Sequence, residues 1–386
     1  MKIMFSAGEP SGDLHGESLA KAILAQDPAI QLVGFGGEKM AAAGIRLCAD
    51  MKEYSVMGVW EVIKNLRKIF ELLDKLTEFM RQEKPDLLVL IDYPDFNWRL
   101  AKRAKAMGIP VFSYIPPSAW AWRKGRARKC GAIADELAAI FPFELPVYEA
   151  AGANISFNGN PLLDTVKPSM SQEEARQFFK VTPGASPVVL LPGSRKHEIT
   201  QLLPPMLAAA ELLQKDNNRL EFYLPVAPGI SRQLIEAIVS RYNVDIHYTQ
   251  DNTYDLMNIG LFALATSGTV VMEAAIMGLP CVCLYRMAAL SYAIGKLLVD
   301  IDFFTLPNIL AGREVQKELL QSEVTGTRIF EEARKYYADA DYRPTVVQGL
   351  KEAVAKLGEP GAAVRVAARI IAAAKKYGKA GREGTE

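Results

Sequence analysis

The sequence predicts an α/β fold with two doubly wound, Rossmann-like domains and a cleft between them. Three observations predict this class. Short apolar runs alternate with helical patterns along the whole chain, most of these runs are continuously apolar, and 386 residues exceed one ordinary core. Continuous apolar runs are typical of parallel strands buried on both faces, and strand–helix repetition is typical of doubly wound sheets.

The expected strands form two series with a polar stretch between them. The first series comprises 2–5, 31–35, 87–91, 111–115, 137–141 and 155–158, and the second comprises 188–191, 221–224, 246–248, 261–265 and 281–285. The Pro- and Gly-containing residues 167–187 place a domain boundary near residue 165. We therefore expect domains over 1–165 and 166–345, followed by helices over 346–386 that can pack back on the first domain.

Composition and missing motifs exclude several functions. Lys and Arg number 45 against 44 Asp and Glu, and this net charge of +1 argues against a dedicated nucleic-acid binder. Three His, and four Cys without zinc spacing, argue against a metal centre. No apolar run reaches the roughly 20 residues that span a bilayer, so we expect a soluble or peripheral protein. The dinucleotide-binding, P-loop and nucleophile-elbow motifs are missing from the sequence.

The first strand runs into a glycine-rich turn that opens a helix. In an α/β fold this junction lies at the carboxyl edge of the sheet, where ligands bind. The turn carries Glu9, Ser11 and Asp13, and its two carboxylates would repel a phosphate. We therefore predict a site for sugar hydroxyls or acid–base chemistry here.

Strand 87–91 delivers Asp92 at its carboxyl end. A carboxylate in this place is suited to act as a general base, and a second nearby carboxylate can raise its pKa. Asp95 and Asn97 follow, and one of them is expected to cap the next helix. Asp92 is thus the candidate catalytic base.

Two apolar features each have a structural and a functional interpretation. Trp120 and Trp122, in a Pro-rich loop, either wall a pocket or pack beneath one. The helix predicted over 59–80 carries an apolar stripe along its full length, with basic residues beside it. That stripe either faces the core or contacts a membrane or an acyl chain.

Two turns in the second series are suited to a phosphate. One follows strand 188–191 and combines backbone N–H groups with a guanidinium group, which suits a pyrophosphate. The other follows strand 261–265, and its helix carries a glutamate able to accept hydrogen bonds from both ribose hydroxyls. Each turn alone is also an ordinary helix start, but together they predict a nucleotide site. The candidate contacts are Gly193, Ser194, Arg195, Ser267, Gly268, Thr269, Glu273 and, further along, Asn308.

Taken together, these motifs resemble those of lipid-A-disaccharide synthases, which are inverting glycosyltransferases of the two-Rossmann GT-B type. The motifs are Ala7–Glu9 with Ser11–Asp13, Met57–Gly58 with Glu61–Val62, Ile91–Asp92 with Pro94–Asn97, Trp120–Arg123, Leu191–Arg195, Ser267–Thr269 with Glu273, Tyr285–Arg286 and Leu306–Asn308. Each is weak alone. Their order along most of the chain makes the resemblance specific.

The resemblance implies a reaction and a location. Members of this family join UDP-2,3-diacylglucosamine to 2,3-diacylglucosamine 1-phosphate (lipid X) in lipid A biosynthesis. The products are a β-1,6-linked tetraacyl disaccharide 1-phosphate and UDP. The resemblance further implies catalysis without a metal or cofactor. It also implies peripheral association of helix 59–80 with the cytoplasmic face of the inner membrane in a Gram-negative bacterium. The oligomeric state stays open.

The resemblance also implies roles for single residues. Asp92 corresponds to the catalytic carboxylate, and Glu9 belongs to the N-terminal site. Arg195 and Asn308 are implied as essential polar residues around the donor. Ser11, Asp13 and Trp122 lie in matching motifs and are taken as substrate contacts. Asn160 stands where many members carry His, so we assign it no role.

Two other functions stay open at this point. One is a different GT-B enzyme, such as a UDP-N-acetylglucosamine 2-epimerase or a transferase with a soluble acceptor. The other is a non-catalytic binder of a sugar nucleotide or an acyl chain. A soluble acceptor would need neither the apolar helix nor the tryptophan loop. A binder would not need Asp92, Arg195, Glu273 and Asn308 together.

Overall fold

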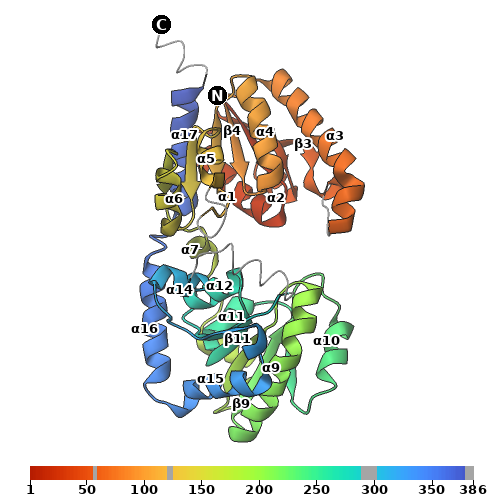
Figure 1. The fold of residues 1–386 in the computed structure, drawn as a ribbon, viewed down its shortest axis with the longest axis vertical. Helices are drawn as coiled ribbons and strands as arrows, with labels where there is room; N and C mark the ends of the chain where they lie inside the picture. Colours follow the sequence, from red (N-terminus) through yellow and green to blue (C-terminus); the bar gives the residue numbers. More distant parts are fainter. Residues whose placement is uncertain (55–58, 120–124, 288–301, 379–386) are drawn as a thin grey trace. The chain divides into compact units, whose positions relative to one another are not determined.

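The computed structural model describes residues 1–54, 59–119, 125–287 and 302–378, with only the helical backbone for 59–66. The chain divides into two compact units. Unit 1 comprises Met1–Pro161 and Leu357–Glu386, and unit 2 comprises Leu162–Lys356. Each unit is built on a parallel sheet flanked by helices (Figure 1). The predicted class of two doubly wound α/β domains is therefore confirmed.

The described part of unit 1 forms a seven-stranded sheet in the order β3-β2-β1-β4-β5-β6-β7. Its helices and strands are β1 (Lys2–Ala7), α1 (Pro10–Gln26), β2 (Gln31–Gly36), α2 (Glu38–Ala42), β3 (Arg46–Asp50), α3 (Val59–Glu83), β4 (Leu87–Ile91), α4 (Pro94–Ala106), β5 (Val111–Tyr114), α5 (Gly125–Gly131), β6 (Glu136–Ala139), α6 (Leu145–Glu149), β7 (Ile155–Phe157) and α17 (Ala362–Tyr377). Strands β1 and β4 are neighbours at its centre and fully buried there, which explains their continuous apolar sequences.

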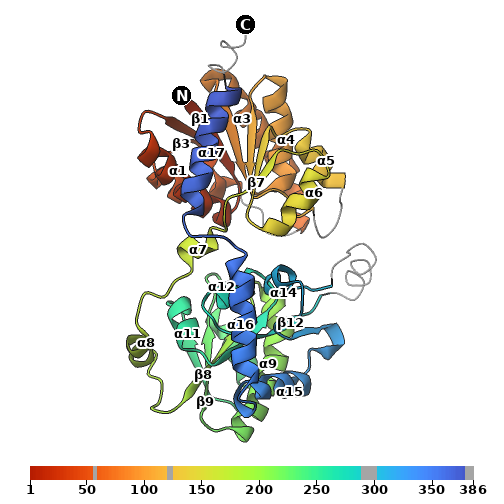
Figure 2. The same ribbon diagram turned by 90° about the vertical axis from the view of Figure 1, so that its left-hand side faces the viewer.

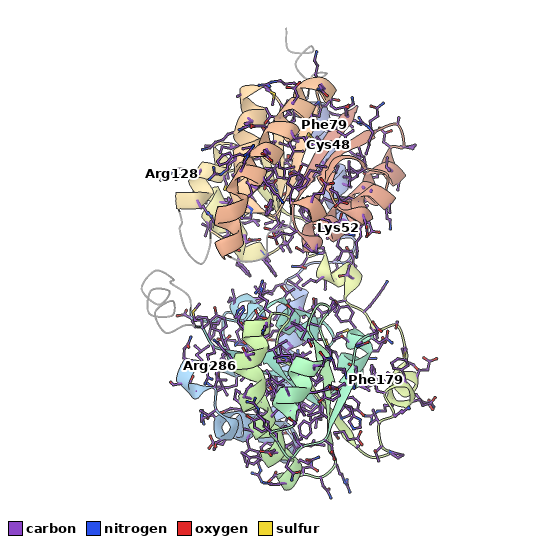
Figure 3. All side chains as sticks on the ribbon, turned by 90° about the vertical axis from the view of Figure 1, so that its right-hand side faces the viewer. Cys48, Lys52, Phe79, Arg128, Phe179 and Arg286 are labelled. Carbon is purple, nitrogen blue, oxygen red and sulfur yellow. The ribbon has the colours of Figure 1, made fainter. Side chains whose placement is uncertain are left out.

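The two faces of this sheet are covered by different helices. One core lies under α3 and α4, and Cys48 and Phe79 lie at its margin (Figure 3). The other core lies under α1 and α17, two helices from opposite ends of the chain that lie side by side (Figure 2). Val366 and Ile370 of α17 are fully buried in it. The C-terminal helix is therefore part of the core of unit 1.

The C-terminal part of the apolar stripe on helix α3 faces the core of unit 1. Leu73, Leu76 and Met80 are buried in the core of unit 1, so this part of the stripe faces the protein. Phe70 is 46% exposed, and the guanidinium of Arg99 lies over its ring. The stripe over 59–66 lies outside the described side chains.

The described part of unit 2 forms a six-stranded parallel sheet in the order β10-β9-β8-β11-β12-β13. Its helices and strands are α7 (Leu162–Thr165), α8 (Gln172–Phe178), β8 (Ser186–Leu191), α9 (Lys196–Asp216), β9 (Leu220–Pro225), α10 (Arg232–Val239), β10 (Ile246–Thr249), α11 (Thr253–Ile259), β11 (Phe262–Thr266), α12 (Thr269–Ile276), β12 (Cys281–Tyr285), α14 (Leu306–Ala311), β13 (Glu318–Leu320), α15 (Gly326–Ala338) and α16 (Tyr342–Ala355). Helix α16 packs against α12 and α14 of this unit.

Each strand expected from the sequence has a counterpart, but β3 and β13 were not expected. Both lie at the edge of a sheet. β3 is only partly buried, and β13 is three residues long. Charged residues bound or begin both strands, Arg46 and Asp50 in β3 and Glu318 in β13, so neither carries a long continuous apolar run. No helix among the described residues has the length and apolarity to cross a membrane.

Candidate active site and nucleotide pocket

The first candidate site lies at the carboxyl edge of the sheet of unit 1. Ala7 pairs with Ile91 in the register of β1 and β4, so Glu9 and Asp92 follow neighbouring strands at one edge. Asp92 and Tyr93 both have a left-handed backbone, with φ of 46° and 50°. A left-handed backbone costs conformational free energy in residues other than glycine, and here two such residues follow one another. Strained backbone conformations of this kind concentrate at functional sites.

Asn97 holds this strained turn in place. Its Nδ2 donates to the carbonyl oxygens of Asp92 at 2.7 Å and of Ser6 at 3.2 Å, and its Oδ1 accepts from Ser6 Oγ at 2.7 Å. Asn97 thereby ties the ends of β1 and β4 together and is itself 1% exposed. The expectation that Asp95 or Asn97 caps α4 is wrong. Asn97 turns inward to these carbonyls, and the N-cap residue of α4 is Tyr93.

Burial sets the electrostatics of Asp92. Partial burial raises the pKa of its carboxyl group, and the hydrogen bond from the Tyr93 N–H partly offsets this. Burial and the charges of Glu9 and Asp95 raise the pKa of the Tyr93 hydroxyl. The Tyr93 ring lies against Gly8, where a β-carbon would overlap it. Glu9 and Asp92 are thus brought to one edge, with Tyr93 beside them.

Asp13 has a structural role that the sequence did not indicate. Its Oδ1 accepts from the backbone N–H groups of Gly37 at 2.8 Å and Met40 at 3.1 Å. Its Oδ2 accepts from the backbone N–H of Lys39 at 3.2 Å. The side chain is buried and holds the N-terminus of α2, where a carboxylate is favoured. The assignment of Asp13 as a substrate contact stays a prediction, while these bonds give the residue a structural role. Ser11 is exposed in the first turn of α1, and Trp122 lies outside the described residues.

The second candidate site is a pocket of about 500 Å³ in unit 2. It lies at the carboxyl ends of β8, β9 and β11, as expected for a doubly wound sheet. The predicted residues that line it are Gly193, Ser194, Arg195, Ser267, Gly268, Thr269 and Glu273. The two turns selected from the sequence therefore share one pocket.

The backbone N–H groups of the turn after β8 already bind a carboxylate of the protein. Glu198 Oε2 accepts from the N–H groups of Ser194 at 3.1 Å and Arg195 at 3.2 Å. Gly193 has φ of 111°, and a β-carbon there would overlap the Glu198 carboxylate. Glu198 therefore occupies the backbone N–H groups that were expected to bind pyrophosphate, and pyrophosphate binding at this turn stays a prediction. The guanidinium of Arg195 still lines the pocket.

The turn after β11 presents a helix N-terminus to the pocket. Gly268, Thr269 and Val270 line it where α12 begins. Ser267 is held by its own bonds, from its N–H to Leu284 at 2.9 Å and from its Oγ to the Phe304 carbonyl at 3.2 Å. The start of α12 carries the positive end of the helix dipole.

Glu273 projects from the second turn of α12 and has a tyrosine partner. Burial raises the pKa of its carboxyl group, and a hydrogen bond from Tyr254 partly offsets this rise. Burial, together with Glu273, raises the pKa of Tyr254 to about 12, so this hydroxyl stays a donor at neutral pH. Tyr254 was missed because nothing in its local sequence marks it. The fold brings Tyr254 of α11 to Glu273 of α12.

Asn308 is a structural residue of unit 2. Its Nδ2 donates to Glu318 Oε1 at 2.8 Å and to the Gln316 carbonyl at 2.9 Å, and its Oδ1 accepts from Val315 N at 2.9 Å. Its side chain is completely buried, and it does not line the pocket of unit 2. Both ends of the amide are thus engaged within the protein, and a role of Asn308 around the donor stays a prediction.

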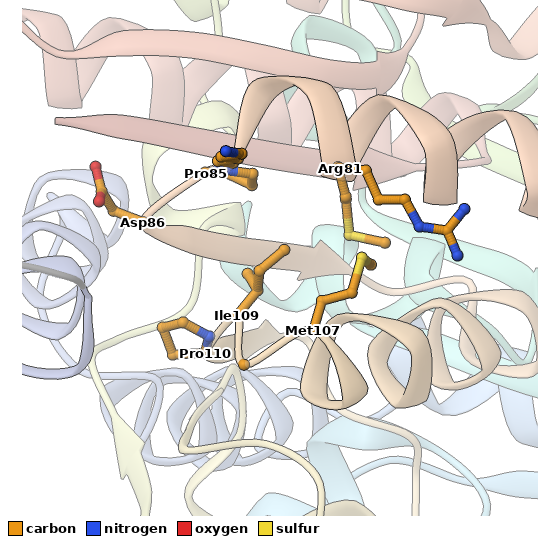
Figure 4. A pocket seen from close by; sticks show the side chains of 9 residues that line it. Arg81, Pro85, Asp86, Met107, Ile109 and Pro110 are labelled. Carbon is orange, nitrogen blue, oxygen red and sulfur yellow. The ribbon is translucent and has the colours of Figure 1, made fainter.

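Another pocket in unit 1 lies away from these candidate residues. Its volume is about 360 Å³, and Arg81, Met107 and Ile109 are among its lining residues (Figure 4). Asp86 and Pro110 line it too, and they directly precede β4 and β5. It therefore lies at the amino edge of the sheet, opposite the edge that carries Asp92.

Two doubly wound units, one with a pocket at the carboxyl edge of its sheet, are the architecture of GT-B proteins. Solved structures agree on this fold. A UDP-GlcNAc 2-epimerase from Neisseria meningitidis bound to UDP-GlcNAc has a TM-score of 0.65 at 14% identity, over 96% of this chain and 100% of that one. The calicheamicin glycosyltransferase CalG4 has a TM-score of 0.61 at 13% identity, over 96% of this chain and 97% of that one.

Sequence relatives identify the family. The family model described as lipid-A-disaccharide synthetase matches residues 3–363. A lipid-A-disaccharide synthase from Syntrophus aciditrophicus is 40% identical over 375 residues, 97% of this chain and 98% of that protein. The same enzyme from Geobacter sulfurreducens is 40% identical over 96% of both chains. The chain belongs to the lipid-A-disaccharide synthase family, as the resemblance of its motifs predicted.

Proposed function

We propose that the protein is a glycosyltransferase that forms the lipid A disaccharide. It transfers the 2,3-diacylglucosaminyl group of its UDP derivative to O6 of 2,3-diacylglucosamine 1-phosphate and releases UDP. The observation that carries the proposal is the family relationship at 40% identity over 97% of the chain. In this proposal unit 2 binds the nucleotide, and unit 1 binds the acceptor.

Asp92 is the proposed general base on the acceptor. Its carboxylate takes the proton of the 6-hydroxyl as that oxygen attacks the anomeric carbon. The raised pKa of Asp92 makes it a stronger base than an exposed aspartate. Glu9, at the same edge, is proposed to accept a hydrogen bond from the acceptor and so to orient it. Ser11 and Trp122 are proposed as acceptor contacts only because they lie in motifs that match the family.

The donor half of the reaction is proposed for the pocket of unit 2. Glu273 accepts hydrogen bonds from the ribose hydroxyls, and the start of α12 faces the diphosphate. As the bond from the anomeric carbon to the diphosphate oxygen breaks, negative charge develops on UDP. Arg195 and the N-terminus of α12 stabilise that charge. Attack from the face opposite the leaving UDP inverts the anomeric centre and gives the β-linkage.

We also propose that unit 1 associates peripherally with the cytoplasmic face of the inner membrane. The acceptor and donor carry acyl chains, and helix α3 has an apolar stripe. The exposed ring of Phe70 and the cation Arg99 above it support a lipid-facing end of this stripe. The buried residues Leu73 and Leu76 anchor the rest of the helix in the core.

The test of the function is a reaction with both diacylated substrates. We expect release of UDP and a tetraacyl disaccharide 1-phosphate of the corresponding mass. UDP-N-acetylglucosamine, with and without a soluble acceptor, serves as the control. Turnover of that control without product from the acylated pair would instead assign a 2-epimerase or a soluble-acceptor transferase.

Replacing Tyr254 by Phe is expected to move the pH dependence of UDP binding. Ribose hydroxyls donate to an ionised Glu273, so UDP affinity falls as the pH drops through the pKa of that carboxyl. Loss of the tyrosine hydrogen bond raises this pKa further, so the affinity of the variant begins to fall at a higher pH. Calorimetric titration between pH 5 and 8 measures this.

The 2′,3′-dideoxy form of UDP is the control ligand. Its diphosphate titrates like that of UDP, but it lacks the hydroxyls that Glu273 would bind. The ratio of the two affinities therefore isolates Glu273. A ratio with the same pH midpoint in both proteins would contradict the proposed role of Tyr254.

A further inference from the structure

The carboxylate of Glu198 accepts three hydrogen bonds at the rim of the pocket proposed for the nucleotide. Its Oε2 holds the N–H groups of Ser194 and Arg195, and its Oε1 accepts from Arg195 Nη1 at 3.0 Å. The backbone and the side chain of Arg195 are thus both held by one carboxylate. Gly193 leaves the space in which that carboxylate lies.

Arg195 depends on this contact because Glu198 is its one ion-pair partner among the residues that the structure describes. It is 73% exposed, whereas the side chain of Glu198 is only 21% exposed. An exposed arginine has about 2 kcal/mol of rotamer entropy to lose when it binds a ligand. The planar guanidinium has five N–H donors, so a bond from Nη1 to Glu198 leaves other donors for a phosphate.

We infer that Glu198 is a positioning residue that aims the Arg195 guanidinium at the diphosphate of the bound nucleotide. This inference rests on the proposed function, because it takes the ligand of this pocket to be a nucleoside diphosphate. Glu198 itself does not contact the diphosphate. The negative charge of Glu198 repels the negative ligand. The pre-organised Arg195 side chain offsets this repulsion, because it loses less conformational entropy on binding.

Affinities for UDP and uridine test the inference. Uridine lacks the diphosphate, so the UDP-to-uridine affinity ratio reports the diphosphate contacts alone. We expect Glu198→Ala to lower this ratio about tenfold, which corresponds to about 1.4 kcal/mol. Glu198→Gln keeps an oxygen acceptor but loses the ion pair, so its ratio should fall in between. Glu236→Ala is the matched control, because its Arg232–Glu236 pair lies on α10 and does not line the pocket.

A double-mutant cycle separates positioning from helix capping. In a protein that already carries Arg195→Ala, we expect Glu198→Ala to lower the ratio no further. Equal losses in both backgrounds, or equal losses for UDP and uridine, would assign Glu198 a capping role only. A higher ratio in Glu198→Ala than in the parent would show that its charge opposes the ligand, and this also overturns the inference. Failure of the parent protein to bind UDP would instead contradict the proposed function.

Discussion

Replacing Asp92 by Asn is expected to lower turnover by a factor of about 10³ and to leave UDP affinity unchanged. A positioned general base contributes roughly 10²- to 10⁴-fold to the rate, and an amide cannot accept the proton of the acceptor hydroxyl. Asp92 belongs to unit 1, whereas the pocket proposed for UDP belongs to unit 2. Single-turnover measurements of disaccharide formation, combined with calorimetric titration of UDP, separate the two effects.

Asp95→Asn is the matched control for this prediction. Asp95 follows Asp92 by three residues, but its side chain is exposed and forms an ion pair with Arg126 at 3.0 Å. Its loss should change the rate little, because exposed ion pairs contribute little. If Asp92→Asn abolished UDP binding while turnover per bound donor survived, Asp92 would not be the base.

Replacing Asn97 by Ala is expected to destabilise unit 1 by about 3 kcal/mol and to reduce turnover as well. The side chain satisfies the buried carbonyl oxygen and hydroxyl of Ser6 and the partly buried carbonyl oxygen of Asp92. Each buried polar group left without a partner costs roughly 1–3 kcal/mol. Turnover should fall too, because the left-handed backbone of Asp92 loses the bond that fixes it. Calorimetric unfolding and kcat of the full chain measure the two effects.

Ser6→Ala distinguishes the two roles of Asn97. It removes only the bond from Ser6 Oγ and keeps the bond from Asn97 to the Asp92 carbonyl. We expect it to cost about 1 kcal/mol with kcat nearly unchanged. If Ser6→Ala reduced kcat as strongly as Asn97→Ala, general loosening of the sheet would explain both results, and Asn97 would have no particular role at Asp92.

Much of the fold could be predicted, because buried parallel strands have a distinctive composition. The expected strands at 87–91 and 261–265 correspond to β4 and β11, which are buried along their length. The edge strands β3 and β13 escaped prediction, because charged residues at their ends, Arg46 and Asp50 in β3 and Glu318 in β13, leave only short apolar runs.

The sequence could predict those candidate site residues that directly follow a strand. Seven residues after β8 and β11 gather in one pocket, since neighbouring parallel strands end at one edge. Asp13 and Asn308 lie in equally polar motifs, but their side chains turn inward and bind backbone groups. Whether a polar side chain meets a ligand or a backbone N–H depends on chain segments distant in sequence, so the motif alone does not decide it.

The sequence by itself determined the family and the two α/β domains, and it selected Asp92 and the two turns after β8 and β11 as candidate sites. These properties are local, because apolar runs, glycine turns and motif order are written in contiguous residues. Only the tertiary structure decided that Asn97 fixes the Asp92 turn, that Glu198 occupies the turn before α9 and that Tyr254 meets Glu273. These pairings form because folding buries polar groups, and each buried group then needs a partner.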